Sequence, residues 1–436
     1  MSSEWPITTL SDLITVKHGF AFKGEFFSNE PSPFQLTTPG NFAIGGGFLL
    51  GKGKYYTGPI LADYVLIKGD LIVTMTDLSQ AADTLGFSAL VPETQGTTWL
   101  HNQRVGRVLI KSGAQVYKDF LHYLMRSNDY RHWVVSSATG STVKHTSPDR
   151  ICAYQFPLPP LKTQRTMAEV LSALDNRITL LRETNGTLEA IAQALFKSWF
   201  VDFDPVRAKA EGLEPEGLDA TTAALFPDSF EESELGLVPN GWNVRSVYDV
   251  ARVIYGAPFA SKRFNTEGVG APLVRIRDLK HESPGVYTDE NHPKGYMIQP
   301  GDLVVGMDGE FRAYLWGGNP AWLNQRVCVF APEPTVPAAF VHRSIMPLLA
   351  AVEASETATT VIHLGKNDID RFRVVVPSQK VLADFAAVVE PIYARIVENK
   401  QTAFSLSALR DTLLPRLISG QLRLPEAEVM VEEVCA

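Results

Sequence analysis

The sequence predicts an α+β protein in which two similar mixed α/β modules are each followed by a long helix. Three observations support this fold class. The chain repeats its own motifs in the same order, each copy alternates short β-favouring runs with turn residues, and an apolar heptad pattern follows each copy. With 436 residues, 45% hydrophobic and 20% charged, the chain has the length and composition of a soluble protein of several domains.

The internal repeat rests on four pairs of motifs. The distance between the paired motifs only shortens along the chain, as expected if the second copy has lost a few loop residues. The pairs are 19–22 with 256–259, 69–75 with 301–307, 102–105 with 324–327, and 139–145 with 357–363. A protein with two copies of one module usually binds a target that itself has two parts.

Local signals mark the ends of each copy. A strand and a short helix are expected after Trp5 and Trp242, and a closing strand is expected before Pro157 and Pro377. In both copies a Gly-Asp pair, at 69–70 and 301–302, precedes an apolar run, as a tight turn would. The predicted division is 1–157 and 236–377 for the modules, 158–205 and 378–423 for the long helices, 206–235 for an acidic linker, and 424–436 for an acidic tail.

Apolar residues recur at alternating steps of three and four after each module, which is the pattern of a coiled coil. Each seam also holds one asparagine, which fixes register because a slipped pairing would leave its amide unsatisfied. Pro391 predicts a kink or a late helix start. Two unrelated amphipathic helices are the alternative. The seam residues are Leu174, Ile178, Leu181, Asn185, Leu188 and Leu195 in the first helix, and Ile392, Ile396, Asn399, Leu406 and Leu413 in the second.

The first helix, expected over 164–200, would be ~55 Å long, which corresponds to roughly 16 base pairs of duplex DNA. A strut of this length can hold two readers on separated half-sites. The net charge of −8 is concentrated in 158–235, with 7 basic and 14 acidic residues, while the modules are nearly neutral. This excludes a non-specific nucleic-acid coat but allows local phosphate contacts.

The three cysteines, at positions 152, 328 and 435, have no paired spacing, which predicts neither a disulfide framework nor a zinc site. The chain also shows no signal-peptide pattern and no apolar run long enough to span a membrane. A reducing cytoplasm and no membrane association are therefore expected.

Three segments carry a resemblance to a known family. The segment 188–205, LEAIAQALFKSWFVDFDP, resembles the central conserved region of specificity subunits of type I restriction-modification enzymes. The segment 236–242, GLVPNGW, resembles the start of that family's second target-recognition domain, and 409–420, LRDTLLPRLISG, resembles the end of its C-terminal helix. The match covers the whole order of domain, helix, domain, helix.

The resemblance implies a non-catalytic, sequence-specific reader of double-stranded DNA in a prokaryotic cytoplasm. Each target-recognition domain would read one half of a bipartite, asymmetric target. The two helices would pack as an antiparallel coiled coil, set the spacer and dock two methyltransferase subunits. No cofactor is then expected in this chain, because the partner methyltransferase and motor-nuclease restriction subunits use S-adenosylmethionine, ATP and Mg²⁺.

The residues themselves offer no catalytic motif. Asp204-Pro205-Val206 lacks the second proline and the aromatic residue of an amino-methyltransferase motif, and the glycine-rich run 46–52 has Gly53 where a phosphate-binding loop needs Ser or Thr. Asp308 and Glu310 could be metal-binding carboxylates, but Thr76 and Leu78 replace them in the first copy. A self-contained nuclease or methyltransferase and a coiled-coil scaffold without DNA contact are the competing hypotheses.

Candidate DNA-binding residues fall into two groups. The repeated ones combine Asn, Gln and Arg, which read base edges in the major groove, but they could equally form a structural turn or a shared phosphate clamp. Both histidines could equally be core residues. This group is Asn102, Gln103, Arg104, Thr142, Lys144, His145, Asn324, Gln325, Arg326, Thr360 and His363.

Residues found in one copy alone are better candidates for base reading, because the two half-sites differ. Arg275 and Arg277 alternate as on a strand, so that both would lie on one face toward DNA, or toward a salt bridge with Asp278. This group is Lys17, His18, Lys23, Lys52, Lys54, Arg275, Arg277, Lys280 and Arg312.

Overall fold

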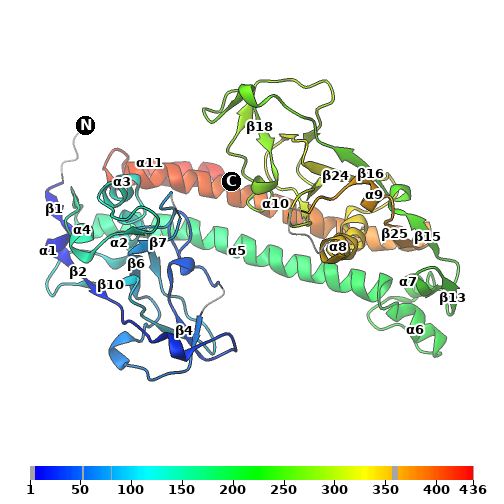
Figure 1. Ribbon diagram of the computed structural model, residues 1–436, viewed down its shortest axis with the longest axis horizontal. Helices are drawn as coiled ribbons and strands as arrows, with labels where there is room; N and C mark the ends of the chain where they lie inside the picture. Colours follow the sequence, from blue (N-terminus) through cyan, green and yellow to red (C-terminus); the bar gives the residue numbers. More distant parts are fainter. Residues whose placement is uncertain (1–4, 52–53, 80, 356–361, 436) are drawn as a thin grey trace. The chain divides into compact units, whose positions relative to one another are not determined.

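The computed structural model describes residues 5–51, 54–79, 81–355 and 362–435. The chain folds into two units, one with residues 1–176 and 406–436 and the other with residues 177–405. Each unit holds one module together with part of each of two 40-residue helices, α5 (Leu161–Phe200) and α10 (Gln379–Ile418). The mixture of strands and helices within each unit confirms the predicted α+β class (Figure 1).

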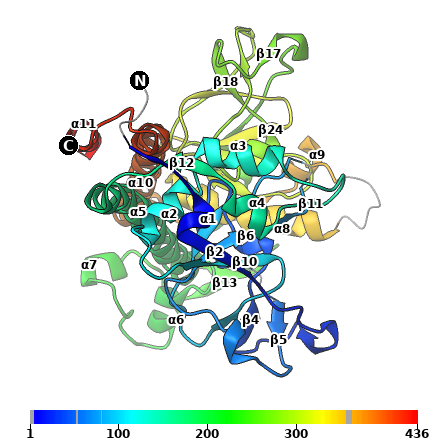
Figure 2. The ribbon, with the colours of Figure 1, turned by 90° about the vertical axis from the view of Figure 1, so that its left-hand side faces the viewer.

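In unit 1, an antiparallel sheet forms the centre of the module, with the strand order β2 (Ile14–His18), β10 (Val105–Ile110), β6 (Leu71–Thr74), β8 (Ser88–Leu90) (Figure 2). A second sheet has the order β3 (Phe27–Ser28), β5 (Lys54–Tyr56), β4 (Phe34–Leu36), β9 (Thr98–Leu100). The opening strand β1 (Ile7–Thr9) pairs with the closing strand β12 (Gln155–Pro157), and β7 (Thr76–Asp77) pairs with β11 (Lys144–His145). The module's helices are α1 (Leu10–Leu13), α2 (Lys118–Leu124), α3 (Asn128–Ser136) and α4 (Pro148–Cys152).

Unit 2 repeats this plan. Its central sheet has the order β16 (Ala251–Tyr255), β24 (Val327–Pro332), β21 (Leu303–Gly306), β22 (Ala313–Leu315). Its second sheet has the order β17 (Phe264–Asn265), β19 (Tyr287–Thr288), β18 (Ala271–Val274), β23 (Ala321–Leu323), β20 (Met297–Ile298). The opening strand β15 (Asn243–Ser246) pairs with the closing strand β25 (Arg373–Val376), and α8 (Ala338–Ser355) and α9 (Lys366–Ile369) complete the module. The central sheets have matching strand orders, so the repeat in sequence is a repeat in structure.

Both Gly-Asp pairs form the predicted tight turns. Gly69 and Gly301 have φ angles of +78° and +99°, which favour glycine because residues with a Cβ atom rarely adopt this backbone conformation. The carboxylates of Asp70 and Asp302 accept hydrogen bonds from the backbone N–H three residues earlier, at 2.9 and 2.8 Å. Each turn leads into a fully buried strand, β6 or β21.

The apolar seam residues of α5 and α10 are mostly buried, as the heptad pattern predicts. α5 begins three residues before the predicted Gln164. The late start expected at Pro391 is wrong, because α10 begins at Gln379 and continues through the proline. Losing one helical hydrogen bond there costs about 3 kcal/mol. Burial of Phe385 and Val389 before it and Ile396 after it offsets this, since each such side chain contributes about 1.5–3 kcal/mol.

The two seam asparagines pair with each other inside unit 2. The Nδ2 group of Asn399 donates to Oδ1 of Asn185 at 2.8 Å, and the Nδ2 group of Asn185 donates to the carbonyl of Ile396 at 3.0 Å. Further along, Phe196 of α5 packs against Phe385 of α10, so the two helices run antiparallel in this unit. The antiparallel packing implied by the family resemblance is confirmed there.

The segment between α5 and the second module, expected to be a linker, is folded. It forms α6 (Asp204–Ala210), α7 (Ala220–Ala223) and a hairpin of β13 (Phe230–Ser233) with β14 (Gly236–Pro239). Val206 and Phe226 are buried in a core that also includes Trp199 and Trp242. The acidic residues of this segment therefore lie on a packed element rather than on a flexible connector.

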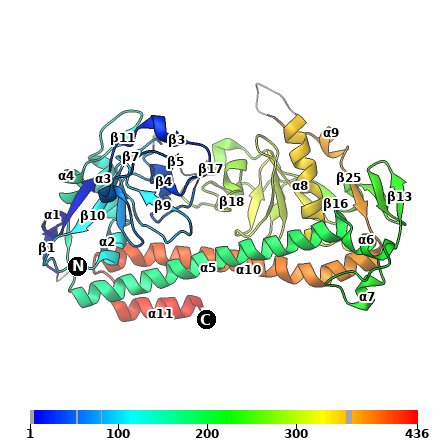
Figure 3. The same cartoon turned by 90° about the horizontal axis from the view of Figure 1, so that it is seen from below.

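The acidic tail is also structured up to residue 435. α10 ends at a turn in which Gly420 has a φ of +73°, and α11 (Leu424–Cys435) then folds back along the long helices of unit 1 (Figure 3). Leu422 and Ala427 are buried there. Among the described residues, no helix is long and apolar enough to cross a membrane.

Candidate nucleic-acid interface

The repeated Asn-Gln-Arg segment forms the same turn in both units. The backbone N–H of Val105 donates to the carbonyl of Asn102 at 3.0 Å, and Val327 does the same to Asn324 at 3.0 Å. A Cβ atom on Gly19 would lie 2.0 Å from the Asn102 carbonyl oxygen, and one on Gly256 would lie 1.9 Å from that of Asn324. The glycine at the start of each module is therefore required by the close approach of this turn.

The turn accounts for the backbone of this motif but not for its side chains. Gln103 and Arg104 are exposed in unit 1, and Gln325 and Arg326 are exposed in unit 2, while both asparagines are half-buried. The four exposed side chains carry the donors and acceptors that read base edges or bind phosphates. Their contact with DNA stays a prediction.

In unit 1, His145 lies beside this turn. Strand β11 places His145 opposite Thr76 of β7, and the Nδ1 atom of His145 lies 3.2 Å from the Thr76 hydroxyl. The backbone N–H of Met75, next to Thr76, donates to the carbonyl of Arg104 at 3.0 Å, which ties the three segments together. His145 is exposed, so it is not a core histidine.

In unit 2, the equivalent residues form a charged cluster. The Nδ1 atom of His363 lies 2.6 Å from Oδ1 of Asp308, and the Nη1 group of Arg326 donates to the same oxygen at 3.4 Å. The side chains of Arg326 and His363 are 54% and 47% exposed, against 24% for Asp308. Asp308, considered from sequence as a metal ligand, is instead paired with Arg326 and His363. No group of three His, Cys, Asp or Glu residues within the described ranges is placed to hold a metal ion.

The strand predicted for 274–278 is wrong. β18 ends at Val274, and Ile276–Asp278 forms a single 3₁₀ turn. The carboxylate of Asp278 causes the turn, because it accepts the backbone N–H of Arg275 at 2.9 Å and also binds its Nε at 3.2 Å. Arg275 is half-buried and paired, whereas Arg277 is exposed, so the two arginines do not share one face.

The remaining predicted residues are spread over several elements: Lys17 and His18 lie on β2 of the central sheet, Lys144 lies on β11, and Lys54 lies on β5 of the second sheet. Lys17 lies over the ring of Tyr64 at 4.6 Å and Lys54 over that of Phe27 at 5.3 Å, while Lys23 pairs with Glu25 and Arg312 with Glu310. The exposed members of this group are His18, Lys23, Lys54, Thr142, Lys280 and Arg312, and Lys17 and Lys144 are half-buried. Lys52 and Thr360 lie outside the described residues.

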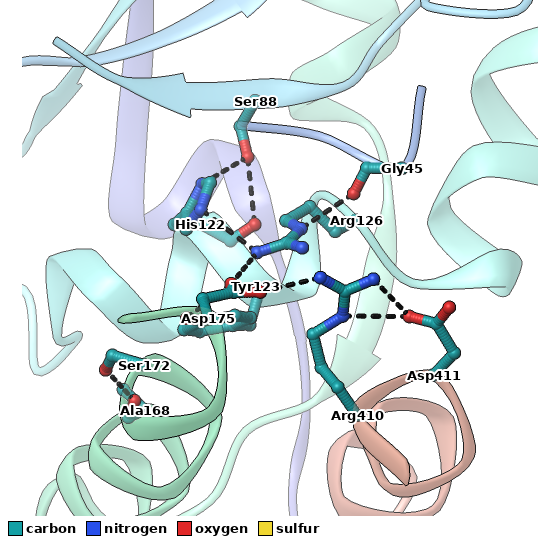
Figure 4. A network of polar contacts seen from close by, with 10 residues as sticks. All are labelled: Gly45, Ser88, His122, Tyr123, Arg126, Ala168, Ser172, Asp175, Arg410 and Asp411. Carbon is teal, nitrogen blue, oxygen red and sulfur yellow. Dashed lines mark hydrogen bonds and ion pairs between the residues drawn. The ribbon is translucent and has the colours of Figure 1, made fainter. Parts of the chain in front are cut away.

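The strongest polar network in unit 1 was not predicted from sequence. Asp175 of α5 accepts hydrogen bonds from the Tyr123 hydroxyl at 2.9 Å, from Arg126 at 2.5 Å and from Arg410 of α10 at 2.7 Å (Figure 4). Burial raises the pKa of Asp175, but the two arginines outweigh that effect and hold its pKa at about 2. Arg126 also donates to the carbonyl of Gly45, so the network joins the module to both long helices.

A pair of buried histidines also marks the repeat. His122 of α2 lies 2.9 Å from the Ser88 hydroxyl of β8, and His342 of α8 lies 3.0 Å from the Ala313 carbonyl of β22. Burial lowers the pKa of His122 to about 3 and that of His342 to about 4, so both are neutral at physiological pH. Each histidine connects a helix to the edge strand of its sheet. This role is structural and separate from that of the exposed clusters.

The comparisons with known proteins agree with this architecture. A family model described as the type I restriction modification DNA specificity domain matches residues 2–190 and 239–401. The chain is 25% identical to the HindI specificity subunit of Haemophilus influenzae over 358 residues, covering 70% of this chain and 78% of that protein. It is also 25% identical to the MjaIX specificity subunit of Methanocaldococcus jannaschii over 338 residues, covering 74% and 73%.

The fold is shared with a solved structure as well. A type I restriction-modification S subunit from M. genitalium superposes with a TM-score of 0.55 at 14% identity, covering 95% of this chain and 96% of that one. The family model alone matches well over half of the sequence, in two blocks that correspond to the two modules. This chain belongs to the family of specificity subunits of type I restriction-modification enzymes.

Proposed function

We propose that the two modules are target-recognition domains that each read one half of a bipartite, asymmetric DNA target, separated by a spacer that α5 and α10 define. As a specificity subunit, the chain recognises DNA sequence within a restriction-modification complex and is not itself a catalyst. The observation that carries the proposal is the repeated framework with different exposed polar residues. Two copies of one scaffold can each bind one segment of a duplex. The differences between their exposed side chains would allow the two copies to read two different sequences.

The proposed partners are two methyltransferase subunits, which would use S-adenosylmethionine, and motor-nuclease restriction subunits, which would use ATP and Mg²⁺. The outer faces of the long helices support such docking. The apolar side chains of Leu180 and Ile191 in α5 and Val388 in α10 are 53%, 44% and 48% exposed. Their burial against a partner subunit would be favourable. The acidic segment from α6 to β14 offers a further charged surface in unit 2.

Methylation mapping tests the two-domain proposal directly. The chain would be co-expressed with its methyltransferase subunit in a host free of other adenine methylation, and methyladenine would be mapped by single-molecule sequencing. We expect one split, asymmetric motif, and no methylation from either subunit alone. Methylation at an unsplit motif would contradict the proposal that two domains read two half-sites.

The spacer proposal has its own test. Inserting one heptad into α5 after residue 176 and one into α10 after residue 405 keeps the seam in phase and lengthens the helix pair by about 10 Å. We expect both half-sites to be retained and the spacer to grow by about three base pairs. A seven-residue insertion after Gly212, in the loop between α6 and α7, is the matched control and should leave the spacer unchanged. An unchanged spacer in the heptad variant would refute the role of the helices.

A further inference from the structure

Positions 76 and 308 occupy the same place in the two domains. In both, the preceding methionine donates its backbone N–H to the arginine of the repeated turn, at 3.0 Å for Met75 and 2.9 Å for Met307. In both, the residue pairs antiparallel with a histidine, Thr76 with His145 and Asp308 with His363. The turn, the segment at position 76 or 308 and the histidine segment therefore pair in the same way in both domains. A different side chain at this position changes the chemistry at an equivalent place in the two folds.

The side chains at this point differ in charge. Thr76 is buried and places a neutral hydroxyl beside His145, whereas Asp308 is partly exposed and carries a carboxylate. Both contacts of Asp308, from His363 and from Arg326, are made to Oδ1. Among the residues that the structure describes, no hydrogen bond is made to Oδ2, so this oxygen retains its acceptor capacity. The contacts from Arg326 and His363 fix the orientation of the carboxylate.

The chemistry of a carboxylate limits what it can meet on DNA. Phosphate oxygens repel it, because both carry negative charge. In the major groove, the exocyclic amino groups of adenine (N6) and cytosine (N4) are the donors available, whereas guanine O6 and thymine O4 are acceptors. An oriented carboxylate in the exposed cluster therefore selects an amino-bearing base and rejects a carbonyl-bearing one.

We propose that Asp308 is a specificity-determining residue, which accepts a hydrogen bond from the exocyclic amino group of an adenine or cytosine in the second half-site. Arg326 and His363 act as positioning residues that hold the carboxylate. The first domain has the buried Thr76 at this place and therefore has no equivalent carboxylate, so its base preference at the corresponding position should differ. This inference rests on the proposed function, because it requires that the second domain reads its own half-site.

The test compares methylation motifs of the complex assembled with the wild-type chain, D308T and D308N. D308T installs the residue of the first domain and should relax or change one base position in the second half-site. A good base contact discriminates roughly 5- to 150-fold, so the preference at that position should fall by a factor in this range. D308N keeps the side-chain shape and should admit thymine or guanine there, because its amide nitrogen can donate. It tests the same contact if D308T fails to assemble.

The matched control is E333T. Glu333 follows β24 at the end opposite Arg326, and its carboxylate lies 3.9 Å from Arg252, so the substitution removes a paired carboxylate of the same domain without touching the cluster. Its motif should equal that of the wild type, and the first half-site should be unchanged in every variant. An unaltered motif in both Asp308 variants, or a uniform loss of methylation with unchanged base preference, would overturn the proposal. A wild-type motif that is not split would instead count against the proposed function.

Discussion

The Asp175 network makes a quantitative prediction about how the first module is held to the helices. D175N keeps the shape of the side chain and removes its charge. Arg126, whose side chain is 4% exposed, then loses its anionic partner while remaining charged, and Arg410 loses one of its two carboxylate partners. Loosening of α2 is the expected result, because Tyr123 and Arg126 connect it to Asp175.

The magnitude follows from the carboxyl pKa. Asp175 has a pKa of about 2 in the folded chain, against an ordinary value of about 3.9, which corresponds to about 2.5 kcal/mol of stabilisation at neutral pH. Removing one partner of a buried ion pair costs about 3–5 kcal/mol, and the side chain of Asp175, at 25% exposed, places it near the lower end. The two routes agree on a loss of about 2.5–3 kcal/mol.

Hydrogen exchange of the full chain measures this loss locally, which is needed because two units do not unfold as one two-state system. Backbone amides of α2 should exchange about 70-fold faster in D175N, while those of α8 in unit 2 serve as an internal reference. D411N is the matched control. Asp411 binds the same Arg410 but is 64% exposed, so its loss should have little effect. Equal exchange of α2 in D175N and D411N would refute this interpretation of the network.

The same variant has a defined pH dependence. Because the folded-state pKa of Asp175 is depressed, its stabilisation is present above pH ~4 and is lost as pH falls toward 2. The difference in α2 exchange between wild type and D175N should therefore be constant from pH 7 to pH 5 and shrink below pH 4. A difference that stays constant down to pH 3 would show that the effect is not electrostatic.

Three further predictions concern the helices and the DNA surface. Replacing Asn399 with Leu leaves Oδ1 of Asn185 without its donor, so N399L should speed hydrogen exchange of the α5 and α10 amides of unit 2 by more than the N185L/N399L double variant does. L181D places a charge in the buried seam and should cost about 3–5 kcal/mol and abolish methyltransferase assembly, measured by gel filtration, while circular dichroism of the sheets is retained. R277A should weaken DNA binding and reduce the slope of log Kd against log salt concentration by about 1, measured by fluorescence anisotropy. R275A should also destabilise the turn that Asp278 caps. An unchanged salt slope in R277A would exclude a phosphate contact.

The features that sequence predicted well are those fixed by local periodicity. The seam from Leu174 to Leu413 was predictable because burial every three or four residues is a property of the sequence itself. The Gly-Asp turns were predictable because their conformation favours glycine and a side-chain acceptor. The strand at Arg275 was not, since alternation over five residues is weaker evidence than one aspartate that caps a turn.

Features that depend on distant partners could not be read from the sequence. Asp175 lies outside the seam, and its partners Arg126 and Arg410 are 49 and 235 residues away along the chain. The cluster around Asp308 was hidden for the same reason, because His363 is 55 residues away and reaches it only through the fold. The repeat offered one usable signal, which is that Asp308 carries a charge where the aligned Thr76 does not.

The geometry of the repeated turn explains how specificity can change while the fold stays constant. A Cβ atom on Gly19 or Gly256 would overlap a backbone carbonyl, so these positions tolerate no side chain without moving the turn. The methionines before positions 76 and 308, by contrast, bond to the turn through their backbone N–H groups, and the side chain of Asp308 is 24% exposed whereas Thr76 is buried. The framework is therefore held by backbone groups, which every residue type supplies. The proposed DNA-reading surface is formed by side chains, which differ between residue types. Substitutions in one domain's reading surface should accordingly alter one half-site and leave the other intact.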